Sequence, residues 1–149
     1  MTTRIGLRKR FERFVAATYL RNVMWCVKRG KAIETAALWG AFYAHHLVDM
    51  YVVAAVLFVG WAVAWFAGLW PVSATDWLFI SIVCVSGLLW FFSARAARRV
   101  INSFRIDELL EQAQPYGSSR EQLVRWLQVL ALVVATVGLA ILWGVANRT

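Results

Sequence analysis

Apolar residues gather into three long runs that are almost free of charge. These runs extend from Met50 to Trp70, from Trp77 to Ala94 and from Trp126 to Ala146. At a helical rise of about 1.5 Å per residue, each run is about 27–31 Å long, which matches the hydrocarbon core of a bilayer. The pattern therefore predicts an all-α integral membrane protein with three transmembrane helices.

Polar and basic residues fall between these runs and set the expected orientation. Residues 1–31 and the segment between the second and third runs are rich in Lys and Arg, whereas the loop at 71–76 contains neither. Basic segments stay on the cytoplasmic side. We therefore expect a cytoplasmic N-terminus, an external C-terminus and, from the charge asymmetry, a place in a bacterial inner membrane.

Composition agrees with membrane placement. Of the 149 residues, 61% are apolar or aromatic and 16% are charged, whereas a soluble domain is about half apolar and a quarter charged. The formal charge is +8, from 16 Lys and Arg against 8 Asp and Glu. Because the basic residues flank apolar runs, they indicate anionic phospholipid headgroups as a partner and not nucleic acid.

Residues 1–31 form a basic segment with helical periodicity between Leu7 and Lys28, ended by Gly30. A largely apolar stripe consists of Leu7, Phe11, Phe14, Thr18, Asn22 and Trp25. This indicates an amphipathic helix at the membrane interface; packing on a protein partner is the alternative. The residues expected to contact lipid headgroups or a partner are Arg8, Lys9, Arg10, Arg13, Lys28, Arg29 and Lys31.

Residues 32–149 are expected to form a single membrane domain. Residues 32–48 either continue the first membrane helix or lie on the surface, and the pattern leaves both open. After the second run no helix breaker occurs before Pro115, so that helix is predicted to continue to about Gln112. Ser118 and Glu121 form a capping-box pattern that starts the third helix near Ser119, which completes a cytoplasmic helical hairpin over about 95–125.

Both histidines, His45 and His46, stand at the foot of the first run, and Asp49 follows His45 by one helical turn. A carboxylate beside a histidine suits a proton relay or a cofactor ligand. Adjacent residues point about 100° apart on a helix, so the pair cannot hold one metal ion. We expect no metal and no cofactor, with haem b on His45 or His46 as the alternative.

Small residues are spaced for close helix packing. Gly60, Ala64 and Gly68 recur every fourth residue in the first run, and the third run contains Ala131, Ala135 and Gly138. Small residues at such spacing let membrane helices approach each other closely. The sequence therefore predicts a helix-packing interface and a homo- or hetero-oligomer with other integral membrane subunits.

The runs contain no Asp, Glu, Lys, Arg or His in their interiors, and no catalytic motif occurs along the chain. We therefore expect a protein that is not an enzyme, namely a non-catalytic subunit or scaffold of a larger complex such as a secretion or conjugation machine or a respiratory complex. One alternative is a haem- or metal-binding or proton-handling subunit that uses His45, His46 and Asp49. Another is a small membrane regulator or immunity-type protein.

Overall fold

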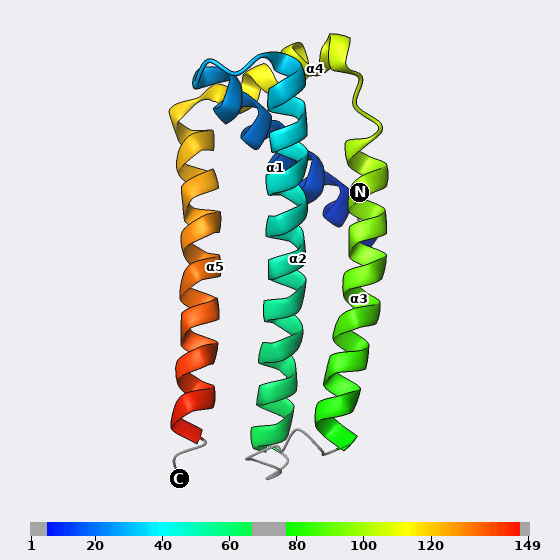
Figure 1. The fold of residues 1–149 in the computed structure, drawn as a ribbon, viewed down its shortest axis with the longest axis vertical. Coiled ribbons are helices and arrows are strands. Elements are labelled where there is room, and N and C mark those ends of the chain that lie inside the picture. The colour runs from blue at the N-terminus through cyan, green and yellow to red at the C-terminus, as the bar shows by residue number, and fades with distance from the viewer. Residues whose placement is uncertain (1–5, 67–76, 147–149) are drawn as a thin grey trace, which may run out of the picture.

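The computed structural model describes residues 6–66 and 77–146, which are helical with no strand among them (Figure 1). The elements are α1 (Leu7–Lys28), α2 (Ile33–Phe66), α3 (Trp77–Ile101), α4 (Ile106–Ala113), the 3₁₀ helix η1 (Gln114–Gly117) and α5 (Ser119–Ala146). The predicted all-α class is therefore confirmed.

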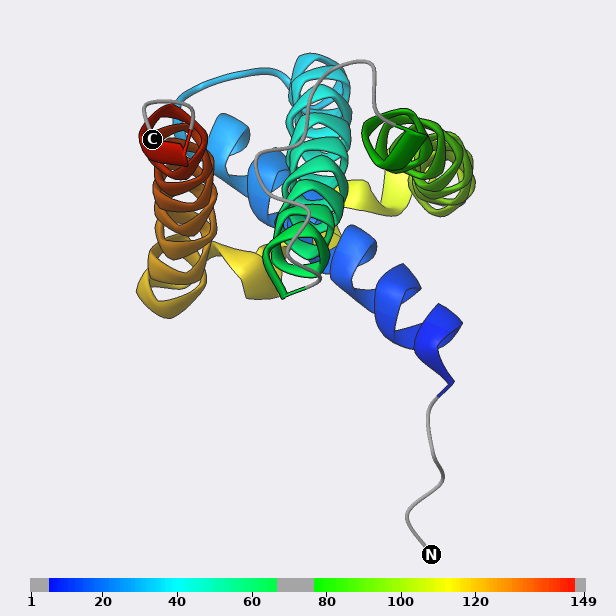
Figure 2. The same cartoon turned by 90° about the horizontal axis from the view of Figure 1, so that it is seen from below.

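Helices α2, α3 and α5 stand side by side with α2 in the middle (Figures 1 and 2). Each contains a segment long and apolar enough to cross a membrane: Ile33–Gly60, Ile80–Ile101 and Ser119–Leu139. The three long helices of the sequence prediction are thus present and suited to a membrane, although residues 67–70 at the end of the first run lie outside the described residues. Helix α2 contacts both α3 and α5, which do not contact each other in the described part of the chain. The three form an open layer and not a closed bundle.

Helix α2 answers the question that the sequence left open. It runs unbroken from Ile33 to Phe66, about 51 Å at the rise of an α-helix. Residues 33–48 therefore continue the first membrane helix. Their apolar face is covered by α1, which crosses α2 at the end of the molecule where α4 also lies (Figure 1).

Helix α1 has the bounds that its periodicity predicted, and its C-terminus is closed by a Schellman motif. The backbone N–H of Lys31 donates to the Cys26 carbonyl at 3.2 Å, and that of Gly30 donates to the Val27 carbonyl at 2.9 Å. Gly30 has φ 77°, a left-handed conformation that only glycine adopts without strain. The sharp turn lets the chain reverse directly into α2.

Most of the stripe of α1 that was predicted to face lipid packs within the chain itself, since Phe11, Phe14 and Trp25 are partly buried against the core. Val15, Tyr19 and Val23 are buried in the protein's own core, together with Thr18 and Asn22 of the stripe. Leu7 at the other end of the stripe is 85% exposed. Most of α1 is therefore a core helix of this chain, and only its first turns are free for the membrane interface, where their placement stays a prediction.

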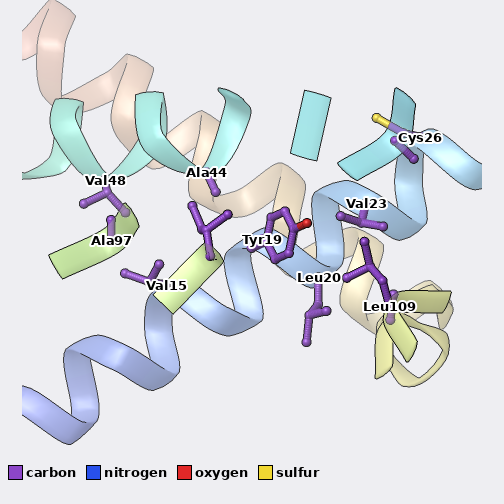
Figure 3. Close-up of a cluster of buried hydrophobic side chains, with 12 residues drawn as sticks. Val15, Tyr19, Leu20, Val23, Cys26, Ala44, Val48, Ala97 and Leu109 are labelled. Atoms are coloured by element: carbon purple, nitrogen blue, oxygen red, sulfur yellow. The ribbon is translucent and has the colours of Figure 1, made fainter. Parts of the chain in front are cut away.

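A hydrophobic core fills the end of the molecule where α1 crosses the other helices (Figure 3). Val15 and Val23 of α1 meet Ala44 of α2, Ala97 of α3 and Leu109 of α4, all at most 1% exposed. Small residues on α2 permit this close crossing. A Cβ atom added at Gly40 would lie 2.5 Å from Val23 Cγ2. We call this region, with α1, α4, η1 and the parts of α2, α3 and α5 that they contact, the packed end.

The prediction that the second helix continues to about Gln112 is wrong, and no simple hairpin extends from α3 to α5. Helix α3 ends at Ile101, and α4 begins at Ile106 after a turn. Asn102 and Ser103 are weak helix formers, and the Ser103 hydroxyl donates to the Val100 carbonyl at 2.6 Å. The break lets α4 fold back across α1 and α2, which brings Leu109 into the core.

The predicted start of the third helix is confirmed, because α5 begins at Ser119. The Ser118 hydroxyl accepts a hydrogen bond from the Glu121 backbone N–H at 3.2 Å, as the capping pattern requires. The Glu121 carboxylate does not complete the box by returning to Ser118. It pairs instead with Arg21 of α1. Glu121 thus contributes its backbone N–H to the cap and its carboxylate to a contact between α5 and α1.

Candidate functional site

His45, His46 and Asp49 lie on α2 where the packed end meets the open layer. His45 is half-buried and interacts electrostatically with Asp49 and with Arg98 of α3. His46 is exposed and stacks on the Phe42 ring, with the ring centroids 4.9 Å apart. The two imidazoles therefore have different surroundings and do not meet at one point. No group of three metal-ligating side chains occurs in the described part of the chain.

Asp49 and Gln128 are polar residues between α2 and α5 that each have a buried side-chain oxygen without a hydrogen-bond partner among the described residues. The two atoms are Asp49 Oδ1 and Gln128 Oε1. Asp49 and His46 line one cavity of about 550 Å³ whose other walls are almost entirely apolar. Those walls come from α2, α3 and α5, and they are Met50, Val53, Ala54, Leu57, Trp90, Thr136 and Leu139. None comes from α1.

A second cavity of about 400 Å³ adjoins the first between α2 and α5, and the two share Ala54 and Leu139. Ala135 and Gly138 of α5 line this second cavity. At its border with the packed end, the Tyr51 hydroxyl donates to the Gln128 carbonyl at 2.6 Å. We call the two cavities together the α2–α5 groove. It is an apolar trough that ends in a carboxylate.

The small residues of the predicted packing interface have different environments. Gly60 is buried against α3, since an added Cβ would lie 2.7 Å from Ile82 Cδ1. Gly68 lies outside the described residues, as do the side-chain surroundings of Ala64. Ala131 and Ala135 on α5 are exposed, and an added Cβ at Gly138 would meet no atom within 4 Å. The first-run glycine thus packs within the chain, whereas the α5 positions are open.

The basic residues expected at the interface are all exposed: Arg8, Lys9, Arg10, Arg13, Lys28, Arg29 and Lys31. Three of them have partners in the chain. Arg8 pairs with Glu12 at 2.8 Å, Lys28 donates to the Gly117 carbonyl, and the Arg29 guanidinium lies 4.2 Å from the centre of the Trp25 ring. Lys28 and Arg29 therefore also serve the packed end.

Sequence reasoning missed Arg125, a second residue besides Glu121 that joins α5 to α1. Arg125 is 6% exposed, and its Nε donates to the Asn22 Oδ1 atom at 2.8 Å. Its guanidinium lies 4.1 Å from the centre of the Trp25 ring, a cation–π contact. Arg125 directly precedes an apolar run, so the sequence suggested a contact with lipid headgroups. The high tryptophan content of the chain was the only sign of an aromatic partner.

Cys26 lies beside this cluster and is buried. Burial raises the pKa of the Cys26 thiol, although the nearby Arg125, Lys31 and Arg29 act against that shift. A thiol with a raised pKa is protonated at neutral pH and is a poor nucleophile. The arrangement around Arg125 therefore holds α1 and α5 together beside a buried, protonated thiol.

The geometry thus contains an open apolar groove with a carboxylate at its end, and a separate polar cluster that fastens α1 to α5. Comparison of the chain with protein-family models, with curated proteins and with solved structures finds no match.

Proposed function

We propose that this chain is a non-catalytic integral subunit or scaffold of a larger membrane assembly. Three helices suited to a membrane and the basic residues at the packed end support a multi-pass protein with a cytoplasmic N-terminus. In this orientation the packed end lies in the cytoplasm. The open layer lies in the bilayer, where a helix of another subunit can join it.

The observation that carries the proposal is the α2–α5 groove. A buried carboxylate oxygen without a donor costs about 1–3 kcal/mol or more, so such a group is normally satisfied by a partner. A helix of another subunit seated in the groove would cover Ala54, Ala135 and Gly138 and would bring a donor to Asp49. Small residues in the trough suit the close approach of such a helix.

The test is purification from the native host in mild detergent with mass spectrometry of the companions. We expect stoichiometric membrane subunits with the wild-type chain and their loss from Ala135→Leu/Gly138→Leu, which fills the groove. Gly87→Leu is the matched control, because Gly87 on α3 is exposed and also has open space around it. Companions that persist with the filled groove would contradict the proposed interface, and a chain purified alone would contradict the subunit role.

Asp49→Leu provides a second variant with a distinctive signature. Removal of this carboxylate should stabilise the isolated chain, because its buried Oδ1 atom has no hydrogen-bond donor among the described residues. The same change should weaken the assembly, because the partner's donor then loses its acceptor. A variant that is neither more stable alone nor impaired in assembly would show that Asp49 is already satisfied by solvent.

A haem- or proton-handling role is the competing proposal, and the electrostatic pairing of His45 with Asp49 is the observation in its favour. The same purified sample distinguishes it by an absorption spectrum near the Soret band. A coloured protein that becomes colourless in the His45→Ala/His46→Ala double variant would establish the haem role. A colourless protein without companions would favour the membrane-regulator alternative.

A further inference from the structure

Two adjoining cavities separate the first turns of α1 from α3. The one nearer the end of α3 has a volume of about 600 Å³ and is lined in part by Arg8, Arg95 and Arg99. The other has a volume of about 920 Å³ and has α2 residues in its wall. The two cavities share Phe92 and Ala96 and are therefore continuous. We call them together the α1–α3 groove.

The first cavity has an excess of positive charge. It is lined by three arginines and one carboxylate, Glu12, which is already paired with Arg8 at 2.8 Å. Arg95 and Arg99 are one helical turn apart on α3 and lie in the same wall. No described carboxylate forms an ion pair with either of them. Two arginines without an ion-pair partner among the described residues therefore line this space.

The second cavity is mostly apolar and extends toward the middle of α3, with Arg8 and Arg10 of the first turns of α1 in its wall. Its walls include Phe14 of α1, Val52 and Val56 of α2, and Leu89 and Phe92 of α3. Leu89 and Phe92 belong to the apolar run that is predicted to span the bilayer, whereas Arg95 and Arg99 follow that run. The order along α3 is thus an apolar channel in the bilayer and then a basic cavity at the level of the headgroups.

We propose that the α1–α3 groove binds one anionic phospholipid of the inner leaflet. Its phosphate lies between Arg95 and Arg99, since guanidinium groups bind phosphate through paired hydrogen bonds. One acyl chain follows the apolar cavity past Val56 and Leu89. A free phosphate ion would use only the basic cavity and would leave the larger apolar one without an occupant. The proposal rests on the membrane placement in the proposed function and not on the existence of other subunits.

The test measures lipid retained by the purified chain in nanodiscs, with native mass spectrometry as the readout. Phosphatidylglycerol should be retained in preference to phosphatidylcholine. Arg95→Gln/Arg99→Gln should weaken phosphatidylglycerol binding about thirtyfold, since each cation near an anionic surface contributes a factor of about five. The control is Arg105→Gln/Arg120→Gln, which makes the same change in net charge at two exposed residues outside the groove. Equal retention by the two double variants would overturn the proposal.

A third variant distinguishes a lipid from a free phosphate. Ala96→Trp fills the junction of the two cavities and leaves every arginine in place. With a lipid bound, this variant should lose phosphatidylglycerol, and 10 mM inorganic phosphate should not displace the lipid from the wild type. Displacement by phosphate, together with full binding by Ala96→Trp, would overturn the lipid assignment and identify a phosphate site. Lipid binding without companion subunits would support this proposal even if the subunit role failed.

Discussion

The packed end buries its apolar side chains, whereas the open layer leaves many of them exposed. In the packed end, Val15, Val23 and Ala44 are 0% exposed and Leu109 is 1% exposed. In the open layer, Leu88 is 59% exposed and Val134 is 62% exposed. A region in contact with water must bury its own apolar side chains, because that burial is the main driving force of folding. A region in lipid has no such need, since lipid tails are as apolar as leucine.

Most of the contacts that hold the helices in one arrangement lie in the packed end. The packed end contains close packing, a Schellman turn and three polar contacts of α1 with η1 and α5, one of them made by the buried Arg125. The open layer has one described hydrogen bond between helices, from Tyr51 to Gln128, and it lies at the border of the packed end. Substitutions should therefore have large effects in one region and small effects in the other.

The largest effect should come from Leu109→Ala in the core. Loss of a fully buried leucine costs about 2–5 kcal/mol in free energy of unfolding, because contacts are lost and a cavity remains. Leu110→Ala is the matched control, since the neighbouring Leu110 is 49% exposed and should cost less than about 1 kcal/mol. Denaturant unfolding in detergent, followed by tryptophan fluorescence, measures both. Equal costs would show that α4 does not pack in solution.

Substitution of one glycine in each region tests how closely the helices approach each other there. Gly40→Ala places a Cβ atom 2.5 Å from Val23 Cγ2 and 3.1 Å from the Val23 backbone N, so α1 must shift. Overpacking of this kind costs about 1–3 kcal/mol. Gly87→Ala in the open layer meets no atom within 4 Å and should stabilise its helix by up to about 1 kcal/mol. Opposite shifts in thermal midpoint are expected, and shifts of the same sign would refute the contrast.

Asn22→Leu removes the hydrogen-bond acceptor of the buried Arg125 guanidinium. A buried charge left without its partner should destabilise the chain by about 2 kcal/mol. The double variant Asn22→Leu/Arg125→Met should recover part of that loss, because an apolar pair needs no hydrogen bond. Thermal unfolding followed by circular dichroism gives both values. A double variant less stable than Asn22→Leu alone would show that the Trp25 contact dominates.

The smallest effects concern two ion pairs. Arg21 and Glu121 join α1 to α5 with side chains 14% and 26% exposed, and a double-mutant cycle should give a coupling of about 1 kcal/mol. Arg8 and Glu12 are 86% and 39% exposed within α1, and their coupling should be about 0.3–0.5 kcal/mol. Added salt should weaken the second coupling more than the first. Equal couplings would mean that the Arg21 pair is fully hydrated.

Local patterns predicted the parts of the fold that local physics decides. The bounds of α1, the glycine at its end and the Ser118 cap follow from residues within one or two turns. The break at Asn102 and Ser103 was missed because both residues can occur within a helix. The free energy gained by burying Leu109 favours the break over a continuous helix. That gain comes from residues distant in the sequence.

The candidate sites divide in the same way. The sequence identified His45, His46 and Asp49, because polar residues at the foot of an apolar run are conspicuous. It did not indicate that Asp49 ends a groove with walls on α3 and α5, since the placement of those helices depends on tertiary packing. The burial of Arg125 was missed for the same reason, because its partners lie on a helix at the other end of the chain.

The contacts of α1 with η1 and α5 determine the order in which the protein can be completed. They join residues 89, 100 and 103 positions apart, from Lys28, Arg21 and Asn22 to Gly117, Glu121 and Arg125. A ribosome releases α1 before these partners, and contacts of such sequence separation form late. Helix α1 can pack on α2, α3 and α4 earlier, but it gains these three contacts only after the ribosome has translated the start of α5.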